Sequence, residues 1–407
     1  MKRSFSSRQR VLLASGLGLI AATYGLVRLA YGLFLPDVQR DLALHSDAAG
    51  WISSGASAVY CLAALAGFVL AARVPRVLVA VAAVVAGGGA LGMAAAVAPV
   101  PFGVACVVAS GGAGLASPAL VQLVAARLPA AAQGRAQAVV NSGTGPGLVG
   151  AGVLALVLLP DWRAAWACSG VFALVVGGVL LVSTRGGRPG HTTRTPVPDT
   201  AWWRRHGAVL ALALLFGAGS AVVWTYGRSL LVDAGAPVVV SVSAWIALGL
   251  GGAAVVVTAP WTSRLRARGQ WAVTTAAVAL AVLALGTAPQ STALALVACA
   301  VFGWGYTAAT GALIAWTTEI DPDRAPAGTS VLFVALVLGQ AAGAAAAGAL
   351  LGTSGAPVVF VVAALVTAAC AALGLRIRGA DAARSSGCTP PTPHPPHGAR
   401  SRRPAGP

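Results

Sequence analysis

Twelve long apolar runs dominate this sequence and restrict what it can fold into. A helix needs about 20 consecutive apolar residues to cross the hydrocarbon core of a bilayer, and each run has about that length or more. Several runs are separated only by Pro/Gly turns. We therefore predict an all-α membrane protein with twelve transmembrane helices, at residues 11–35, 48–72, 76–98, 101–126, 137–159, 164–183, 207–232, 239–262, 270–288, 291–317, 327–351 and 356–375.

The composition indicates that lipid is the solvent of this chain. Only 9% of the 407 residues are charged, whereas soluble domains carry roughly 25%. The six cysteines form no CxxC pair and no Cys/His cluster, so we expect neither a disulfide framework nor a metal site. The sequence contains no Ser/His/Asp nucleophile motif and no phosphate-binding GxxxxGKS/T loop. An enzyme is therefore disfavoured, and we expect no cofactor.

Positive charge is concentrated on one side of the predicted membrane. Basic loops stay cytoplasmic. If the N-terminus is inside, 23 of the 27 Lys and Arg residues are inside, and only Arg40 and Arg163 lie in outer loops. The last two, Arg28 and Arg228, lie within apolar runs. This distribution predicts cytoplasmic termini and accounts for the net charge of +17 without nucleic acid as a partner.

The first run invites a second interpretation. Four basic residues precede it, as in a secretory signal: Lys2, Arg3, Arg8 and Arg10. Its apolar stretch is too long for a signal, however, and no small-residue cleavage site stands out. We expect it to be the first transmembrane helix.

The two halves of the chain resemble each other at an offset near 194 residues. The matching positions are Trp51-Ile52 with Trp245-Ile246, Ala105-Cys106 with Ala298-Cys299, and Tyr31-Gly32 and Asp37 with Tyr226-Gly227 and Asp233. Six helices per repeat predict two parallel, pseudo-symmetric bundles related by an axis along the membrane normal.

The domain organisation follows from this repeat. We expect a six-helix bundle over 1–183, a Pro/Gly-rich cytoplasmic linker over 184–206, a second six-helix bundle over 207–377 and a disordered, low-complexity cytoplasmic tail over 378–407. Trp202 and Trp203, beside two arginines, are expected to anchor the linker at the lipid headgroups.

Four stretches carry a family resemblance: YGLVRLAYGLFLPD (24–37), NSGTGPG (141–147), YGRSLLVDAG (226–235) and AGTSVLF (327–333). They resemble the major facilitator superfamily, and within it a bacterial branch labelled YbfB/YjiJ-type. The resemblance covers roughly residues 10–377. It implies two six-helix bundles in a bacterial inner membrane, both termini cytoplasmic, and secondary transport by alternating access.

Two family motifs are incomplete. Between the second and third runs, GFVLAARVPR keeps Gly67, Arg73 and Arg76 but lacks the acidic residue and the second glycine of the family signature. The family's usual charge-based gate between helices 2 and 11 is therefore in question. In the fifth run, GTGPGLVGAG (143–152) resembles the Gly-Pro motif of proton-driven exporters, which points to efflux.

Arg28 is the most unusual residue of the first run. An arginine at the centre of a membrane helix costs about 2.5–3.5 kcal/mol, so it must face protein or water. Tyr24, Arg28 and Tyr31 are spaced i, i+4 and i+7, which places them on one helix face. A guanidinium flanked by rings can hold a carboxylate with two hydrogen bonds or stack on a planar group. The resemblance implies that this face lines a central cavity. The alternatives are a structural arginine and one that snorkels to the headgroups.

Five further residues are candidates for substrate binding, each with a structural alternative. Arg228 lies near the end of its run and either contacts the substrate or reaches the outer headgroups. Trp304 and Tyr306 stand among glycines and either face a ligand or pack between helices. Asn141 and Gln340 are amides in apolar runs, and either bind the substrate or join helices through hydrogen bonds.

Proton coupling would need a titratable group within the membrane, commonly Asp, Glu or His. All five histidines fall outside the predicted spans. The candidates are therefore acids at span ends: Asp37 and Asp233 at the outer side, and Glu319 at the inner side. Alternatively, each is a solvated loop charge, or the proton travels with the substrate.

These observations predict a secondary active transporter, expected as a monomer, for a small organic solute. Arginine and aromatic rings without a buried acid favour an organic anion. One alternative is a multidrug-type exporter of neutral apolar compounds, and another is a membrane receptor that kept the fold and lost transport.

Overall fold

The computed structural model describes residues 7–185 and 199–377. The predicted all-helical fold is confirmed, because twelve stretches within these ranges are helical and apolar enough to cross a membrane. The elements are α1 (Ser7–Ile20), η1 (Ala21–Arg28), α2 (Tyr31–Leu42), α3 (Ser46–Leu70), α4 (Pro75–Ala95), α5 (Pro99–Arg127), α6 (Ala130–Asn141), α7 (Thr144–Leu158), α8 (Trp162–Ser183), α9 (Thr200–Asp233), α10 (Val238–Thr262), α11 (Ala267–Thr287), α12 (Thr292–Ile320), η2 (Pro322–Arg324), α13 (Ala325–Ser354) and α14 (Ala356–Arg376).

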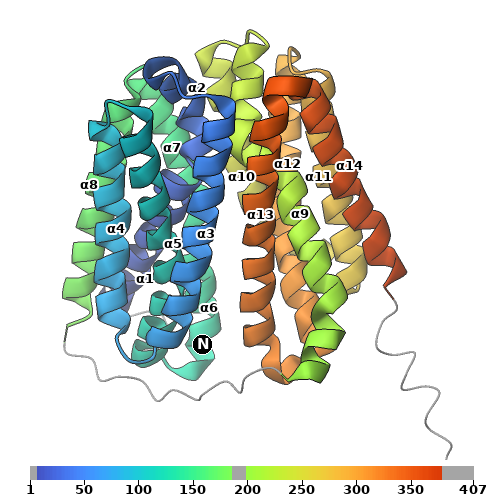
Figure 1. Cartoon of the computed structure of the whole chain (residues 1–407). Coiled ribbons are helices and arrows are strands. Elements are labelled where there is room, and N and C mark those ends of the chain that lie inside the picture. Colours follow the sequence, from blue (N-terminus) through green and yellow to red (C-terminus); the bar gives the residue numbers. More distant parts are fainter. Residues whose placement is uncertain (1–6, 186–198, 378–407) are drawn as a thin grey trace, which may run out of the picture.

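The helices fall into two groups that stand side by side (Figure 1). Helices α1–α8 form the first bundle, in which α4 packs against α5 and α8. Helices α9–α14 form the second, in which α9 packs against α13 and α11 against α14. We call the end where α8 finishes and α9 begins the linker end, and the opposite end the far end.

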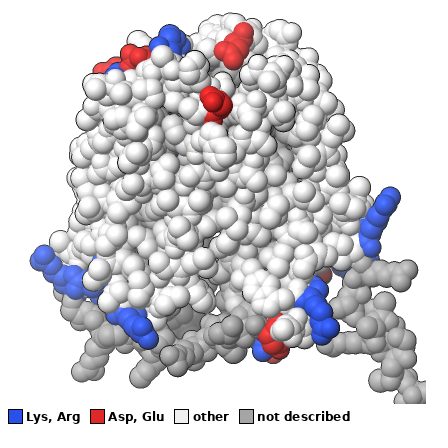
Figure 2. Space-filling view, viewed as in Figure 1, with Lys and Arg blue, Asp and Glu red and all other residues white. Residues whose placement is uncertain are grey.

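The surface of the molecule matches a lipid environment. Figure 2 shows an uncharged middle band with charged side chains confined to the two ends. Large apolar side chains such as Leu62, Val157 and Val256 are exposed. In water such an extended apolar surface would drive association, whereas lipid tails solvate it.

Glycines permit the closest helix contacts. A Cβ on Gly25 would overlap the backbone of Gly147, and one on Gly303 would overlap the Leu248 carbonyl oxygen. Small residues of this kind let membrane helices approach until their backbones touch. This packing explains why a chain with 51 glycines can still form long helices.

The first span is not a regular helix. Residues Ala21–Arg28 form a π-helix, in which the Leu29 backbone N–H donates to the Tyr24 carbonyl at 2.8 Å, an i to i+5 bond. A two-residue turn then leads into α2, which continues to Leu42. Such π-segments are frequent at functional sites, and this one carries Arg28.

Three expectations about the chain around residue 206 are wrong. Helix α9 begins at Thr200 rather than at 207, so the last part of the predicted linker is helical. Trp202 is completely buried and cannot anchor at headgroups, although Trp203 is exposed. His206 is also buried within a span. The rest of the predicted linker and the predicted tail lie almost entirely outside the described residues.

Candidate functional site

A small cavity lies where the two bundles meet. Its volume is about 40 Å³, which is room for a few water molecules. The first bundle contributes Arg28, Leu29, Tyr31, Ser53, Ala56, Ser57, Cys106 and Ser110, and the second contributes Ala221, Trp224, Thr225 and Gln340. As it stands, the cavity has room for water rather than for an organic solute.

Arg28 lines this cavity without an acidic partner. Its Nη2 donates to the Ser57 hydroxyl at 3.5 Å, and its guanidinium carbon lies 4.4 Å from the centre of the Tyr60 ring. Its Nε is buried without a hydrogen-bond partner. Among the described residues, no carboxylate forms an ion pair with it. The Arg28 guanidinium, with one hydrogen bond, one ring contact and no acid partner, therefore lies beside the cavity.

Tyr24 and Tyr31 lie on either side of Arg28, and all three side chains contact α3. The Tyr24 hydroxyl lies 3.0 Å from that of Tyr60, and the Tyr31 hydroxyl donates to the Ala49 carbonyl at 3.0 Å. The three thus share one face, as their spacing predicts, although the segment is a π-helix. Tyr31 reaches the cavity with its ring, because its hydroxyl is already bonded.

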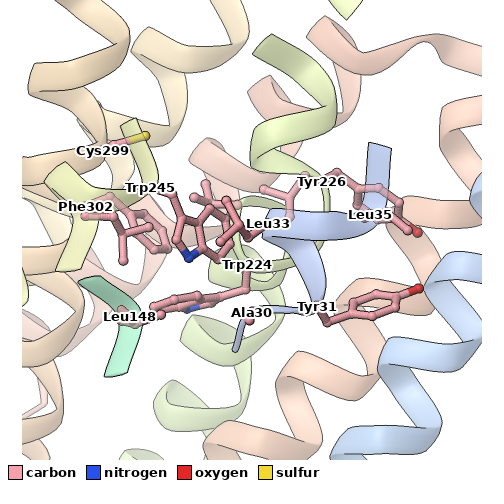
Figure 3. Packing of buried hydrophobic residues seen from close by; sticks show 14 of the residues in the cluster. Ala30, Tyr31, Leu33, Leu35, Leu148, Trp224, Tyr226, Trp245, Cys299 and Phe302 are labelled. Atoms are coloured by element: carbon pink, nitrogen blue, oxygen red, sulfur yellow. The ribbon is translucent and has the colours of Figure 1, made fainter. Parts of the chain in front are cut away.

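The wall of the second bundle is aromatic. Trp224 packs edge-on against Trp245, Phe302 and Tyr306, with ring centres 5.1–6.1 Å apart; Figure 3 shows Trp224 below Trp245 with Phe302 nearby. The Gln340 amide donates to the Tyr306 hydroxyl at 3.0 Å, which joins α13 to α12.

Three of the eight predicted substrate-binding residues line the cavity, namely Arg28, Tyr31 and Gln340. The other five do not: Tyr24, Asn141, Arg228, Trp304 and Tyr306. The Trp304 indole N–H donates to the Thr258 hydroxyl of α10 at 2.8 Å. Trp304 and Tyr306 are two positions apart on a helix and so point to opposite sides. Asn141 is exposed at the end of α6 and does not line the cavity.

Arg228 and Asp37 form a buried ion pair that joins the bundles near the far end. Their side chains are 1% and 4% exposed, and Arg228 Nη1 lies 2.5 Å from Asp37 Oδ2. The same nitrogen donates to the Leu33 carbonyl at 2.6 Å, and Nε donates to the Ser241 hydroxyl at 3.2 Å. Arg228 does not snorkel to headgroups, because α2 covers it. Asp37 is not a rim acid either, because α2 extends beyond it to Leu42.

The other two acidic candidates are exposed. Asp233 lies at the far end of α9 and lines a second cavity of about 150 Å³, together with Gln39, Ser46 and Ser229. Glu319 lies at the linker end, where its carboxylate accepts a hydrogen bond from the Ala267 backbone N–H at 2.9 Å. Glu319 therefore caps the N-terminus of α11.

A polar cluster closes the linker end of the second bundle. Asp199 accepts the Trp202 backbone N–H at 2.7 Å, and this bond, with help from Arg324, lowers the pKa of the Asp199 carboxyl below its ordinary value. His206 stacks on Trp202, with ring centres 3.8 Å apart, and lies 3.0 Å from the Thr317 hydroxyl. These bonds tie the start of α9 to α12 and η2.

Sequence reasoning missed Ser110 and Trp224 at the cavity. Neither residue type stands out in an apolar run, where serine usually bonds its own helix and tryptophan packs. The internal repeat matches Tyr226 with Tyr31 in the sequence, but only Tyr31 lines the cavity. Within residues 7–185 and 199–377, no three His, Cys, Asp or Glu side chains come together as metal ligands.

The chain matches one protein family in sequence and several solved structures in fold. The profile of the Major Facilitator Superfamily matches residues 17–331. No curated protein sequence matches the chain. Among solved structures, the nucleoside transporter NupG aligns with a TM-score of 0.74 and 13% identity, covering 91% of this chain and 99% of that chain.

Two further structures align over similar lengths. A bacterial homologue of the human lysosomal transporter Spinster, in an inward-facing and occupied conformation, has a TM-score of 0.73 and 14% identity, covering 92% of this chain and 97% of that chain. The xylose transporter XylE from E. coli, in a partially occluded inward-open conformation, has a TM-score of 0.70 and 13% identity, covering 91% and 98%. At these identities the likeness establishes the fold alone.

Proposed function

Because the chain belongs to the Major Facilitator Superfamily, we propose that it is a secondary active transporter that moves a small organic anion across a bacterial inner membrane by alternating access. One observation carries the choice of an anion. Arg28 lies beside a cavity between the bundles, and no carboxylate among the described residues pairs with it.

The position of the Arg28 charge supports this choice. The side chain is half-buried, and a charge that becomes fully buried is stable only when it is paired and hydrogen-bonded. The protein supplies Arg28 with one long hydrogen bond and a ring face, so a bound carboxylate would complete its coordination. A cationic solute would meet repulsion from Arg28 and no counter-charge in the cavity lining.

The aromatic wall favours a planar body for this anion. Trp224 and Tyr31 present rings from the two sides of the cavity, and rings recognise planar groups by offset or edge-on packing. The same wall favours the second candidate function, export of neutral aromatic compounds. Charge separates the two candidates, because only an anion requires Arg28.

The transport cycle requires the far end to open. The Asp37–Arg228 pair joins α2 to α9 there, and both partners are buried. We propose that uptake of a proton by Asp37 releases this pair and couples transport to protons. Asp233 and Glu319 are weaker candidates, because one is exposed and the other caps a helix.

Orientation and family branch belong to the same proposal. Basic residues gather at the linker end, where Figure 2 shows most of the visible Lys and Arg side chains, and the positive-inside rule then places that end in the cytoplasm. The four quoted sequence stretches support the YbfB/YjiJ-type branch, and the Gly-Pro motif of residues 143–152 supports efflux.

Counterflow in liposomes tests the anion proposal. Purified protein is reconstituted with an internal panel of organic acids, matched carboxamides and amines, and uptake of the labelled counterpart is measured. We expect exchange of one or more acids, little exchange of amines, and loss of acid exchange in Arg28→Gln. Arg163→Gln is the control, because this arginine pairs with Asp41 at the far surface. Exchange of amides equal to that of acids, unaffected by Arg28→Gln, would overturn the anion proposal and favour the neutral compounds.

A further inference from the structure

Three hydrogen-bond donors around the cavity have no acceptor. They are Arg28 Nε, the Ser110 hydroxyl and the Trp224 indole N–H, and all three atoms are buried. Buried polar groups are almost always paired, because an unsatisfied one costs about 1–3 kcal/mol. The three residues that carry these atoms all line one cavity of about 40 Å³, so their unmet hydrogen bonds call for a common explanation.

Ser110 differs from the other buried serines of the spans. Ser169 and Ser220 donate to carbonyls three or four positions earlier in their own helices, at 2.9 and 3.1 Å. This local bond is the usual way in which a helical serine satisfies its hydroxyl. Ser110 makes no such bond, although the residue lines the cavity.

Trp224 differs from the other tryptophans with an unpaired indole. Trp166, Trp202 and Trp245 also lack an acceptor, but none of them lines the cavity. The Trp224 ring is fixed by its neighbours Trp245, Phe302 and Tyr306. Its N–H therefore has a set direction, whereas Ser110 can rotate.

The donors come from both bundles. Arg28 lies in η1 and Ser110 in α5, whereas Trp224 lies in α9. Ser53 and Thr225, whose hydroxyl oxygens lie 3.0 Å apart, share one hydrogen bond across the same seam.

We infer that Arg28, Ser110 and Trp224 together form a binding site for a carboxylate head group, which accepts hydrogen bonds from both bundles at once. This inference rests on the proposed transport of an organic anion and assigns its contacts. A carboxylate offers only acceptors and has two oxygens with about four lone-pair sites, so it can accept from all three groups. A carboxamide has one acceptor oxygen and no charge to pair with Arg28, so it should bind more weakly.

Binding of benzoate and benzamide, two probes with the same ring, tests the inference. The melting temperature of the purified full-length protein is measured against probe concentration, since a ligand that binds the folded state raises it. We expect benzoate to stabilise wild type far more than benzamide does. Ser110→Ala removes one donor with little change of volume, and Trp224→Phe removes one donor together with part of the indole ring. Each should raise the apparent Kd for benzoate about tenfold or more. Ser169→Ala and Trp166→Phe are the matched controls and should leave it unchanged, because neither residue lines the cavity and the Trp166 ring packs on Phe34, away from Trp224.

The outcomes separate this inference from the proposed function. If Arg28→Gln abolishes the benzoate response while Ser110→Ala and Trp224→Phe retain it, the anion proposal stands and the three-donor site is wrong. If benzamide stabilises wild type as well as benzoate does, the carboxylate site is overturned. If benzoate has no effect on wild type, both are overturned.

Discussion

Arg228 and Asp37 show how one pair of residues can decide both stability and motion. Each is buried, and each is the other's main charge partner, although Asp37 also meets Arg40 at 3.4 Å. Removing one member of a buried pair leaves an uncompensated charge, which typically costs about 3–5 kcal/mol, whereas replacing both with apolar residues is often neutral.

We therefore expect Asp37→Leu and Arg228→Met each to destabilise the protein by about 3–5 kcal/mol, and the double variant to recover most of that loss. Thermal unfolding in detergent, arranged as a double-mutant cycle, measures the coupling. The Asp41–Arg163 pair is the control, because its side chains are 46% and 36% exposed and its removal should cost about 1 kcal/mol or less. Additive losses at Asp37 and Arg228 would contradict the pairing.

Arg28 could be predicted from the sequence at this scale, and the Asp37–Arg228 pair could not. A charge inside an apolar run is visible without a structure, because its burial must be compensated. The ion pair joins residues separated by 191 positions, and the internal repeat matched Asp37 with Asp233 instead. His206 was missed because α9 begins before the apolar run does. Polar first turns are invisible to a hydropathy pattern.

Helices α3 and α13 meet at a crossing that seals the far end. The Tyr226 hydroxyl donates to the Ser46 carbonyl at 2.8 Å. A Cβ on Gly50 would lie 2.6 Å from the Ala344 carbonyl oxygen and 3.2 Å from the Gly348 Cα. Neither backbone contact can give way, so the crossing requires glycine on α3.

Gly50→Ala should therefore favour the far-open state. Overpacking of this kind costs about 1–3 kcal/mol in the closed state, which corresponds to roughly a tenfold shift in the population. The measurement is the rate at which a membrane-impermeant thiol reagent labels Ser53→Cys from the far side, with the six native cysteines replaced by alanine. Gly88→Ala is the control, because a Cβ there meets nothing within 4 Å. Equal rates in Gly50→Ala and Gly88→Ala would show that this crossing is not the seal.

The spans themselves could be predicted because length and apolarity are properties of single segments. Breaks within a span depend on neighbours instead. The π-helix at Ala21–Arg28 lies where Gly25 touches the Gly147 backbone and Gly32 touches the Trp224 carbonyl. The local sequence ATYGLVR does not predict the π-helix, because the residues that pack against its irregular backbone come from other helices.

On the scale of the whole molecule, orientation follows from charge. We expect a membrane-impermeant reagent applied outside the cell to label a cysteine introduced in the segment 40–47, but not one in 186–195, because basic loops generally stay cytoplasmic. Lysed cells, in which both sites should react, serve as the control. The reverse pattern would overturn the orientation and the charge argument together.

Proton coupling would let one carboxyl, that of Asp37, govern how the two bundles move. The charged groups facing Asp37 are Arg228 on α9 and Arg40 on its own helix, and the next acid along α2, Asp41, is paired with Arg163 of α8. Neutralising Asp37 removes the attraction that holds α2 to α9, so acid on the far side should favour opening there.

We expect Asp37→Asn to lose the response of transport to an imposed proton gradient in liposomes, while Asp233→Asn and Glu319→Gln keep it. The asparagine retains an acceptor for Arg228, so the variant should still fold, which its melting temperature checks. Labelling of Ser53→Cys from the far side should speed up as the pH falls in wild type, after correction for the thiol's own reactivity, and should not do so in Asp37→Asn. If all three variants keep the wild-type response, no carboxyl among them carries the proton. The proton would then travel on the substrate, as its neutral acid. In that case the unpaired donors around Arg28 would bind the ionised carboxylate and would disfavour binding of the protonated form.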